Sequence, residues 1–336
     1  MPADLHPGEI FAEARTSCDP ALREAVEQLP DPLRLMAGYH FGWWDETGHP
    51  TRGRSGKGLR AALVFAVTAA CGGAESTAVA AAAAIEMLHN FTLVHDDVMD
   101  ADEMRHGRAT VWRVWGSDAA LVLGDAMHAM TIRMLLNLPT ASVAEAVGRV
   151  EAATVEMCRG QYEDLMFESR PTVEAGEYMR MVLGKTGSLM GCACALGALC
   201  ADADADTVAA FDHFGRELGA AFQFTDDVLG IVGDTAVTGK PVGNDLARRK
   251  RSLPVVAALD SGCPEAADLR ELYRSDGPMT TADVARATRF VEACGALDWT
   301  RQQADLRAQS AFAALPAGTA TVRLRLLTQA AVRRDQ

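Results

Sequence analysis

The stretch that decides the fold runs from residue 76 to residue 100 and reads STAVAAAAAIEMLHNFTLVHDDVMD. It contains no proline, and its apolar residues recur at helical spacing with little of the period-two alternation of a strand. It therefore predicts one long helix, near 76–100, that ends in a group of aspartates. A shorter helix is expected near 58–71, because Gly72 and Gly73 separate the two segments.

The rest of the chain has the same character. Prolines crowd the first fifty residues, whereas residues 51–138 and 172–240 contain none, and aromatic residues are only 6%. Further helices are expected near 117–136, 141–168, 173–200 and 205–233, with several more from residue 264 to the C-terminus. Without a repeat or a break in composition, we predict an all-α protein: one large helical bundle domain over residues 1–336. Residues 1–50 and 265–336 are expected to be helical but say little about function.

The charge balance limits the partners. The 336 residues include 45 acidic and 32 basic ones, which gives a formal net charge of -13. Such a chain gains little from counterion release along a phosphate backbone, so we expect neither nucleic-acid binding nor adhesion to anionic membranes. Only four of the basic residues are lysines: Lys57, Lys185, Lys240 and Lys250.

Cysteine usage and the N-terminal sequence bear on location. The eight cysteines form no CxxC pair and lie mostly in Ala, Leu and Gly-rich surroundings, so we predict reduced core residues and a cytoplasmic protein. No secretion signal is recognisable at the start of the chain. The longest uncharged run, Thr186–Ala201, has 16 residues and falls short of the roughly 18–20 that a membrane span needs. No transmembrane segment is expected.

Two groups of aspartates indicate a metal site. On one helix Asp96 and Asp97 precede Asp100 by four and three residues, so the three share a face, where like charges repel one another unless a cation is present. A second pair, Asp226 and Asp227, lies in the helix expected near 205–233. Carboxylate oxygens suit Mg²⁺, which proteins often bind together with substrate phosphates. The predicted ligand is therefore a metal-bound diphosphate.

The lysines support a phosphate ligand. Lys57, Lys185 and Lys240 each adjoin a glycine, where the backbone can approach a phosphate and donate its N–H groups, and Lys250 follows Asp245 by five residues. A chain that otherwise favours arginine retains lysine at these places, which suits a mobile contact to a phosphate that moves.

Eight short motifs are specific when taken together: GKGLR at 56–60, ExxH at 86–89, DDVMD at 96–100, RHGRAT at 105–110, GQYEDL at 160–165, KTG at 185–187, FQFTDD at 222–227 and GKPVGND at 239–245. From about Arg54 to Leu253 the chain resembles the trans-isoprenyl diphosphate synthases, or polyprenyl synthetases. The resemblance is strongest to short-chain farnesyl and geranylgeranyl diphosphate synthases of actinobacterial type. It implies an all-α homodimer in which two aspartate motifs face each other across a deep central cavity.

The resemblance also implies roles for individual residues. Binding of three Mg²⁺ ions, shared with substrate diphosphate, falls to Asp96, Asp97, Asp100, Asp226 and Asp227. Binding of the allylic diphosphate falls to Arg105, Lys185, Lys240 and Lys250. Binding of isopentenyl diphosphate falls to Lys57, Arg60, His89 and the position of His106. Gln223 and Thr186 would lie near the reacting carbons. Cations would neutralise the leaving diphosphate while the alkene of isopentenyl diphosphate attacks the allylic carbon.

Three residues in these motifs depart from the family pattern. The second arginine after the first aspartate motif is His106, which is only partly charged at neutral pH, so the acceptor site is altered. The following proline is Ala109, and the third aspartate of the second motif is Gly230. Asp234 is a possible replacement that acts through water.

In the family, product length depends on bulk below the first aspartates. Phe91 and Thr92 precede Asp96 by five and four residues, about one helical turn deeper. One Phe beside a small Thr favours geranylgeranyl diphosphate, a C20 product, with farnesyl diphosphate, C15, as the near alternative. Phe91 as an ordinary core residue is equally compatible with the sequence.

Three other functions share parts of the pattern. A class I terpene cyclase, or a prenyltransferase with an unusual acceptor, uses the same fold, and His106 keeps it open. However, its usual NDxxSxxxE motif is not completed, since Arg248 and Ser252 stand where Ser and Glu are required. A di-iron bundle needs a second pair like Glu86 and His89. A non-catalytic regulatory subunit would be expected to lack the aspartates.

Overall fold

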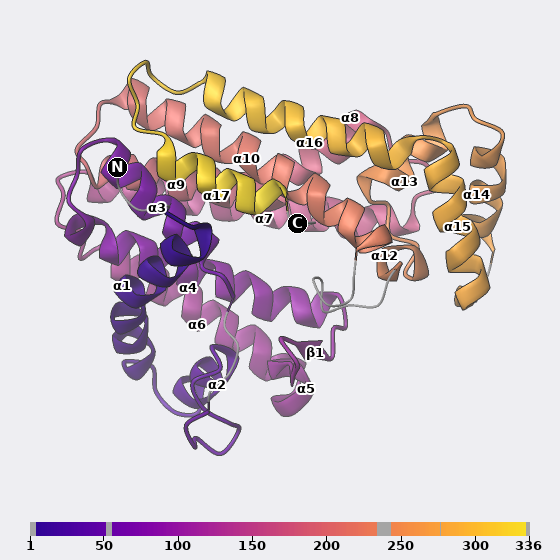
Figure 1. Ribbon diagram of the computed structural model, residues 1–336. Helices are drawn as coiled ribbons and strands as arrows, with labels where there is room; N and C mark the ends of the chain where they lie inside the picture. Colours follow the sequence, from indigo (N-terminus) through magenta and orange to yellow (C-terminus); the bar gives the residue numbers. More distant parts are fainter. Residues whose placement is uncertain (1–4, 52–55, 234–242, 276, 334–336) are drawn as a thin grey trace. The chain divides into compact units, whose positions relative to one another are not determined.

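Helices make up nearly all of the regular structure (Figure 1). The computed structural model describes residues 5–51, 56–233, 243–275 and 277–333. In these residues the only strands form one short antiparallel hairpin, β1 (Met104–Arg105) and β2 (Arg108–Ala109). The all-α prediction is confirmed.

Residue contacts divide the chain into two compact units. The first unit consists of Met1–Val150, Ala193–Ala209 and Ala317–Leu327. The second consists of Glu151–Cys192, Ala210–Pro316 and Thr328–Gln336. Each unit is thus assembled from segments far apart in the sequence, and the interpretation as one domain stays a prediction.

The first unit holds most of the N-terminal helices. They are α1 (Pro7–Glu27), α2 (Leu33–His40), α3 (Leu59–Ala70), α4 (Glu75–Met99), α5 (Val111–Trp115) and α6 (Ser117–Leu135). Four helices contribute residues to both units: α7 (Val143–Ser169), α9 (Ser188–Leu199), α10 (Ala205–Val232) and α17 (Val322–Val332).

The second unit holds shorter helices. They are α8 (Ala175–Val182), the π-helix η1 (Leu183–Gly187), α12 (Asn244–Ala247), α13 (Leu253–Asp260), α14 (Glu265–Arg274), α15 (Thr281–Ala293) and α16 (Ala296–Ala313). Every helix predicted between residues 58 and 233 is present to within a few residues. The π-helical turn inside the helix expected near 173–200 was not predicted.

The long helix α4 forms the core of the first unit, where it packs against α6 (Figure 1). Its residues 81–85 are small or branched and wholly buried. At the aspartate end, a Cβ on Gly124 of α6 would lie only 2.1 Å from Nε2 of His95. The glycine therefore leaves room for this ring, whose Nε2 donates to the Leu121 carbonyl at 3.0 Å.

Two apolar clusters fix helix α10 in the second unit. Val228 and Ile231 pack with residues of α13, α14, α15 and α16. Phe224 packs with Tyr178 of α8 and with Leu253, the first residue of α13. Because Asp226 and Asp227 lie between these contacts, their helix is held on both sides of the aspartate pair.

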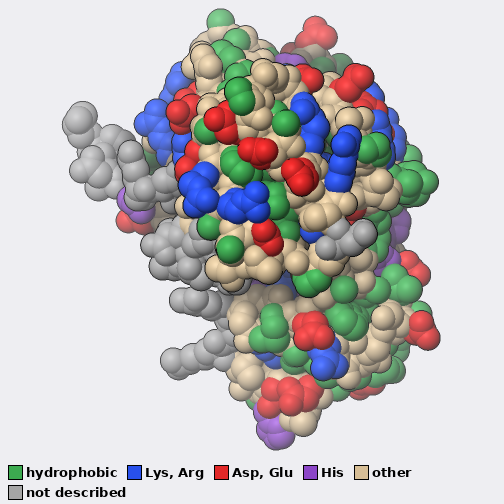
Figure 2. Space-filling model, turned by 90° about the vertical axis from the view of Figure 1, so that its right-hand side faces the viewer, with side chains coloured by type: hydrophobic (Ala, Val, Ile, Leu, Met, Phe, Trp, Pro, Cys, Tyr) green, Lys and Arg blue, Asp and Glu red, His purple; other side chains and the backbone are tan. Residues whose placement is uncertain are grey.

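Two helical stretches are long and apolar enough to cross a membrane by length and composition alone, Glu75–Met99 and Ala175–Leu199. Their apolar windows are 56% and 89% buried inside the protein, as is usual for core helices. Acidic, basic and hydrophobic side chains are interspersed over the described residues on the face in Figure 2.

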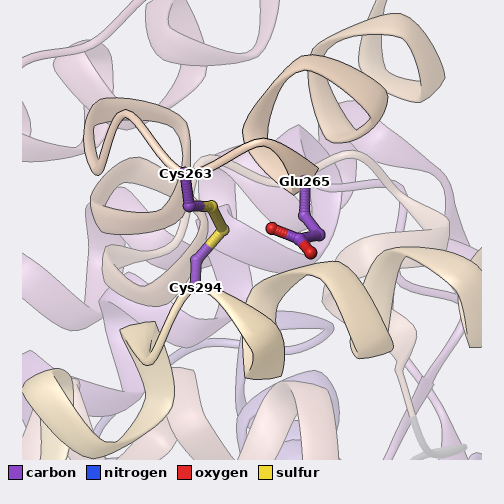
Figure 3. A group of neighbouring side chains, drawn as sticks. All are labelled: Cys263, Glu265 and Cys294. Atoms are coloured by element: carbon purple, nitrogen blue, oxygen red, sulfur yellow. A yellow bond between two sulfur atoms is a disulfide. The ribbon is translucent and has the colours of Figure 1, made fainter.

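A disulfide joins Cys263 and Cys294, which are 31 residues apart, with Glu265 beside them (Figure 3). The prediction that all cysteines are reduced is wrong for this pair. Cys263 precedes α14 and Cys294 caps the C-terminus of α15, and these two helices pack together. The packing brings the sulfurs together, a proximity that sequence spacing does not reveal.

We predict that this disulfide stabilises the second unit. Reduction should lower the free energy of unfolding by about 3–4 kcal/mol, because the unfolded chain regains the entropy of a loop of this length. Urea unfolding with and without a thiol reductant measures the difference. In the Cys263→Ser/Cys294→Ser variant the reductant should have no effect; an equal loss there would show that the stabilisation has another origin.

Candidate functional site

The first aspartate motif lies at the C-terminal end of α4, where Asp100 is the C-cap residue. A helix C-terminus carries partial negative charge, so three carboxylates at this place require cations nearby. Arg105 supplies one: its Nε donates to Asp97 Oδ1 at 2.8 Å and its Nη2 to the same oxygen at 2.6 Å. Asp97 is buried, whereas Asp96 and Asp100 are partly exposed.

The pKa of Asp97 reflects this environment. Burial raises the pKa, and the hydrogen bonds and charge of Arg105 act in the opposite direction. Arg105 Nε also donates to the second oxygen, Oδ2, at 3.1 Å. Both oxygens of Asp97 are therefore already bonded to the protein, which leaves Asp96 and Asp100 as the more accessible carboxylates of this motif.

The hairpin that carries Arg105 gives a backbone reason for a histidine at position 106. Arg105 pairs with Arg108, so the turn consists of His106 and Gly107, with φ angles of 51° and 80°. A two-residue turn with two positive φ angles is of the type I′ kind that suits the twist of a hairpin. Histidine adopts a positive φ more readily than most residues. A residue that looked like an altered ligand therefore also has a backbone role.

The predicted acceptor residues come together only in part. Arg60 in the first turn of α3 donates Nη1–H to Nε2 of His89 on α4 at 3.0 Å. Because guanidinium only donates, the proton of neutral His89 lies on Nδ1. Burial, followed by the charges of Arg60 and Arg105, lowers the pKa of His89 well below its usual value. Lys57 precedes α3 and is exposed.

Sequence reasoning missed His40, at the end of α2. Its Nε2 lies 3.0 Å from Asn90 Oδ1, one residue after His89. Burial, followed by the charge of Arg105, lowers the pKa of His40 to about 3. His106 also acts on the pKa values of both His40 and His89. No motif surrounds His40, so only the packing of α2 reveals this cluster of neutral histidines among arginines.

The residues proposed to set product length lie on the same helix. The buried ring of Phe91 packs against His95 and His128, with centroids 5.0 and 5.5 Å apart. Thr92 donates its hydroxyl to the His89 carbonyl at 2.7 Å. Phe91 is therefore a packed core residue, and its role as a floor stays a prediction.

The second aspartate motif, like the first, has one buried and one more exposed aspartate. Asp227 is buried, and its carboxylate accepts hydrogen bonds from the Tyr178 hydroxyl, Gln223 Nε2 at 3.0 Å and the Leu253 N–H at 3.0 Å. Burial raises the pKa of Asp227 to about 6. Asp226 is more exposed. In both motifs, the second aspartate is bonded to the protein and the first is the more accessible.

Gln223 links the second motif to the KTG motif. Its Oε1 accepts the Thr186 hydroxyl at 2.9 Å, while its Nε2 donates to Asp227. The structure thus brings together two residues that the sequence assigned to the reacting carbons. Tyr178, which completes the hydrogen bonds around Asp227, had no motif to mark it.

Gly230 has a specific reason to lack a side chain. A Cβ at this position would lie 2.2 Å from Oδ2 of Asp245. The carboxylate of Asp245, from the GKPVGND motif, therefore occupies the space beside the position where the family's third aspartate would stand. Asp234, the replacement considered from the sequence, lies outside the described residues.

Two of the predicted diphosphate ligands share one counter-ion. Lys185 Nζ lies 2.6 Å from Asp164 Oδ2, and Lys250 Nζ lies 3.7 Å from the same oxygen. Burial acts to raise the pKa of Asp164, but the charges of Lys250 and Lys185 hold it below its usual value. Asp164 belongs to the GQYEDL motif but received no role from the sequence. Lys240 lies outside the described residues.

The π-helix η1 positions Lys185 within the otherwise continuous helix Ala175–Leu199. Such turns are rare in proteins, and those that occur often lie at functional sites. Glycines allow close contact on both sides: a Cβ on Gly160 of α7 would lie 2.3 Å from Lys185 N, and one on Gly219 of α10 would lie 2.7 Å from the Cα of Gly187. The turn is therefore enclosed by the backbones of α7 and α10.

Comparison with known proteins identifies the family. Residues 43–291 match the sequence pattern of the polyprenyl synthetase family. The chain belongs to this family. The geranylgeranyl diphosphate synthase of Mycobacterium tuberculosis (strain ATCC 25618 / H37Rv) is 50% identical over 337 residues, which cover 100% of this chain and 96% of the relative.

Other relatives agree. The (2E,6E)-farnesyl diphosphate synthase of Mycobacterium bovis (strain ATCC BAA-935 / AF2122/97) is 40% identical over 88% of this chain and 83% of the relative. The crystal structure of a polyprenyl synthetase from Streptomyces coelicolor A3(2) has a TM-score of 0.90 at 37% identity, and covers 96% of this chain and 99% of that one. The present chain, as a polyprenyl synthetase, is a prenyltransferase, as its sequence predicted.

The neutral state of His40 predicts a pH dependence of stability. Its pKa is about 3 in the folded protein against 6.5 ordinarily, so below pH 6.5 the unfolded chain binds the extra proton. As the pH is lowered from 6.5 toward 3, the free energy of unfolding should decrease by up to about 1.4 kcal/mol per pH unit.

Urea unfolding of the His40→Gln variant at pH 7 and pH 5 tests this prediction. Glutamine keeps a donor for Asn90 but does not titrate, so the variant should lose less stability between the two pH values than the wild type. Comparison with the wild type cancels the titration of other groups. His213→Gln, at an exposed histidine, is the matched control. Equal losses in wild type and the His40 variant would contradict the assignment.

Proposed function

We propose that the protein condenses isopentenyl diphosphate with an allylic diphosphate, head to tail and with trans geometry, in the presence of Mg²⁺. The product proposed is geranylgeranyl diphosphate, with farnesyl diphosphate as the near alternative. One observation carries the proposal: cationic groups accompany both aspartate motifs. Arg60 lies beside His89 on the helix of the first motif, and Lys185 and Lys250 lie in the unit of the second. Two diphosphate substrates need two such groups, whereas a cyclase needs one.

The donor set suits Mg²⁺. In the described part of the chain, one group of three potential metal ligands has its ligand atoms within 4.8 Å of one another: Cys263, Glu265 and Cys294. The two sulfurs of this group are joined in the disulfide. The aspartates instead offer separate accessible carboxylates, which matches an ion that keeps water and takes part of its ligands from substrate phosphates. We assign these contacts mainly to Asp96, Asp100 and Asp226. Asp97 and Asp227 orient the motifs from inside.

Bound Mg²⁺ would supply neutralising charge to the leaving diphosphate. The protein side chains do the rest. Lys185 and Lys250, together with Lys240, hold the allylic diphosphate and offset the charge that grows on it as its C–O bond breaks. The acceptor alkene forms the new C–C bond, and the departing diphosphate takes the proton that restores a double bond. Gln223 and Thr186, fixed by Asp227, orient the reacting end.

We also propose that this synthase acts as a homodimer in the cytoplasm, with residues 1–336 as one functional domain. Val155, Tyr162 and Met166 of α7 are exposed although apolar, and their spacing of seven and four residues places them along one side of the helix. Such a stripe on a long helix favours contact with a second copy of the chain. Gel filtration with light scattering, on the wild type and on Tyr162→Glu, tests the dimer.

The activity is tested with purified protein, Mg²⁺, isopentenyl diphosphate and each of the C5, C10 and C15 allylic diphosphates, with products sized after dephosphorylation. We expect elongation, and a loss of kcat of at least about 100-fold in Asp96→Asn, because charge on the leaving diphosphate is no longer offset. Asp305→Asn, at an exposed position of α16, is the control. Release of a hydrocarbon or alcohol, without elongation of any starter, would favour a cyclase instead.

Product length is tested at the position below the first motif. If Phe91 is the floor, Phe91→Ala should yield products at least one C5 unit longer, and Thr92→Phe should yield shorter ones. Chain-length analysis under excess isopentenyl diphosphate measures both. Unchanged products in Phe91→Ala, with activity retained, would rule out the floor and leave Phe91 as a core residue.

A further inference from the structure

We propose that Asp164 is a positioning residue that gathers Lys185 and Lys250 into a single anion site for the allylic diphosphate. The inference rests on the proposed function and adds a residue to its binding machinery. Asp164 has no role among those that the motifs assign, and its carboxylate is turned toward the lysines rather than toward an arginine fork.

The geometry is that of one anion between two cations. Oδ2 of Asp164 lies 2.6 Å from one ammonium and 3.7 Å from the other, and its side chain is only 14% exposed. The lysine side chains, at 23% and 30%, remain more accessible. Two ammonium groups this close repel each other strongly when partly shielded from water, and the carboxylate removes that repulsion. The two ammonium groups together carry more charge than Asp164 alone offsets.

Residues of helix α7 contact both the backbone and the side chain of Lys185 and so fix their positions. Gly160 lies one turn before Asp164, and a Cβ there would lie 2.3 Å from Lys185 N and 2.8 Å from the Met181 carbonyl. The absence of that Cβ lets the π-helical turn rest directly on α7. Asp164 then meets the ammonium on the same face of the helix, because residues four apart are neighbours.

Lys250 reaches the same oxygen from a separately anchored loop. Its N–H donates to the Asp245 carbonyl at 2.8 Å, and its carbonyl accepts the Tyr273 hydroxyl at 3.3 Å. The preceding residue, Arg249, has a positive φ of 52°. The backbone on both sides of the lysine is thus fixed, and its side chain brings Nζ to within 3.7 Å of Asp164 Oδ2.

A structural ion pair would give the same picture but different kinetics. If Asp164 only stabilised the fold, its loss would reduce the amount of active enzyme and leave KM unchanged. If Asp164 positions the lysines, its loss weakens the binding of diphosphate equally in the ground state and in the transition state. KM for the allylic substrate then rises while kcat changes little.

The test compares Asp164→Asn, Asp164→Glu and Glu156→Gln. We expect Asp164→Asn to raise KM for the allylic diphosphate about tenfold or more, with kcat within about threefold and KM for isopentenyl diphosphate unchanged. Asp164→Glu keeps the charge and should recover most of the affinity. Glu156→Gln is the matched control, because Glu156 also lies on α7 and forms an ion pair of 2.6 Å with Arg216 of α10. It should leave both KM values unchanged.

Calorimetric titration with inorganic diphosphate and Mg²⁺ gives a second readout that needs no turnover. Binding should weaken about tenfold in Asp164→Asn and be retained in the control. Unchanged KM and unchanged diphosphate affinity in Asp164→Asn would overturn the inference, even if its thermal stability falls. A wild type that binds diphosphate but elongates no starter would refute the proposed function instead, and the titration would still decide the role of Asp164.

Discussion

Repulsion between carboxylates is the constraint on which this protein depends. Both motifs place neighbouring aspartates on apolar helices, and one member of each pair is buried. The protein supplies hydrogen-bond donors to each buried aspartate. Arg105 donates to Asp97, whereas Tyr178, Gln223 and the Leu253 backbone donate to Asp227. Once the inner aspartate is satisfied, the outer one can face a ligand. Each motif thus pairs one buried carboxylate that the protein satisfies with one carboxylate that is more accessible.

The helices could be predicted because proline-free apolar stretches leave few alternatives. The family could be predicted because its motifs are specific in combination. The π-helical turn could not, because α8, η1 and α9 read as one helix and the turn depends on glycines of α7 and α10. His40, Tyr178 and Asp245 were missed for a similar reason. Each acts through a contact with a residue far away in the sequence, and nothing local distinguishes it.

Two departures from the family pattern also meet local requirements of the fold. His106 looked like a lost cation, yet it occupies a turn position whose positive φ histidine tolerates better than most residues. Gly230 looked like a lost ligand, yet the Asp245 carboxylate leaves no room for a side chain there. In both cases the residue type answers a local requirement of the backbone or of packing, and not only the chemistry of the substrate.

The glycine contacts of α7, η1 and α10 have an evolutionary consequence. Helices that touch backbone to backbone cannot accept even a methyl group without moving apart, so these positions have almost no neutral variation available to them. The lysine and the threonine of the π-helical turn are therefore carried on a backbone whose position is closely fixed. Phe91 of the first unit, by contrast, makes its contacts through its ring, so a substitution there changes side-chain packing and not the path of a backbone.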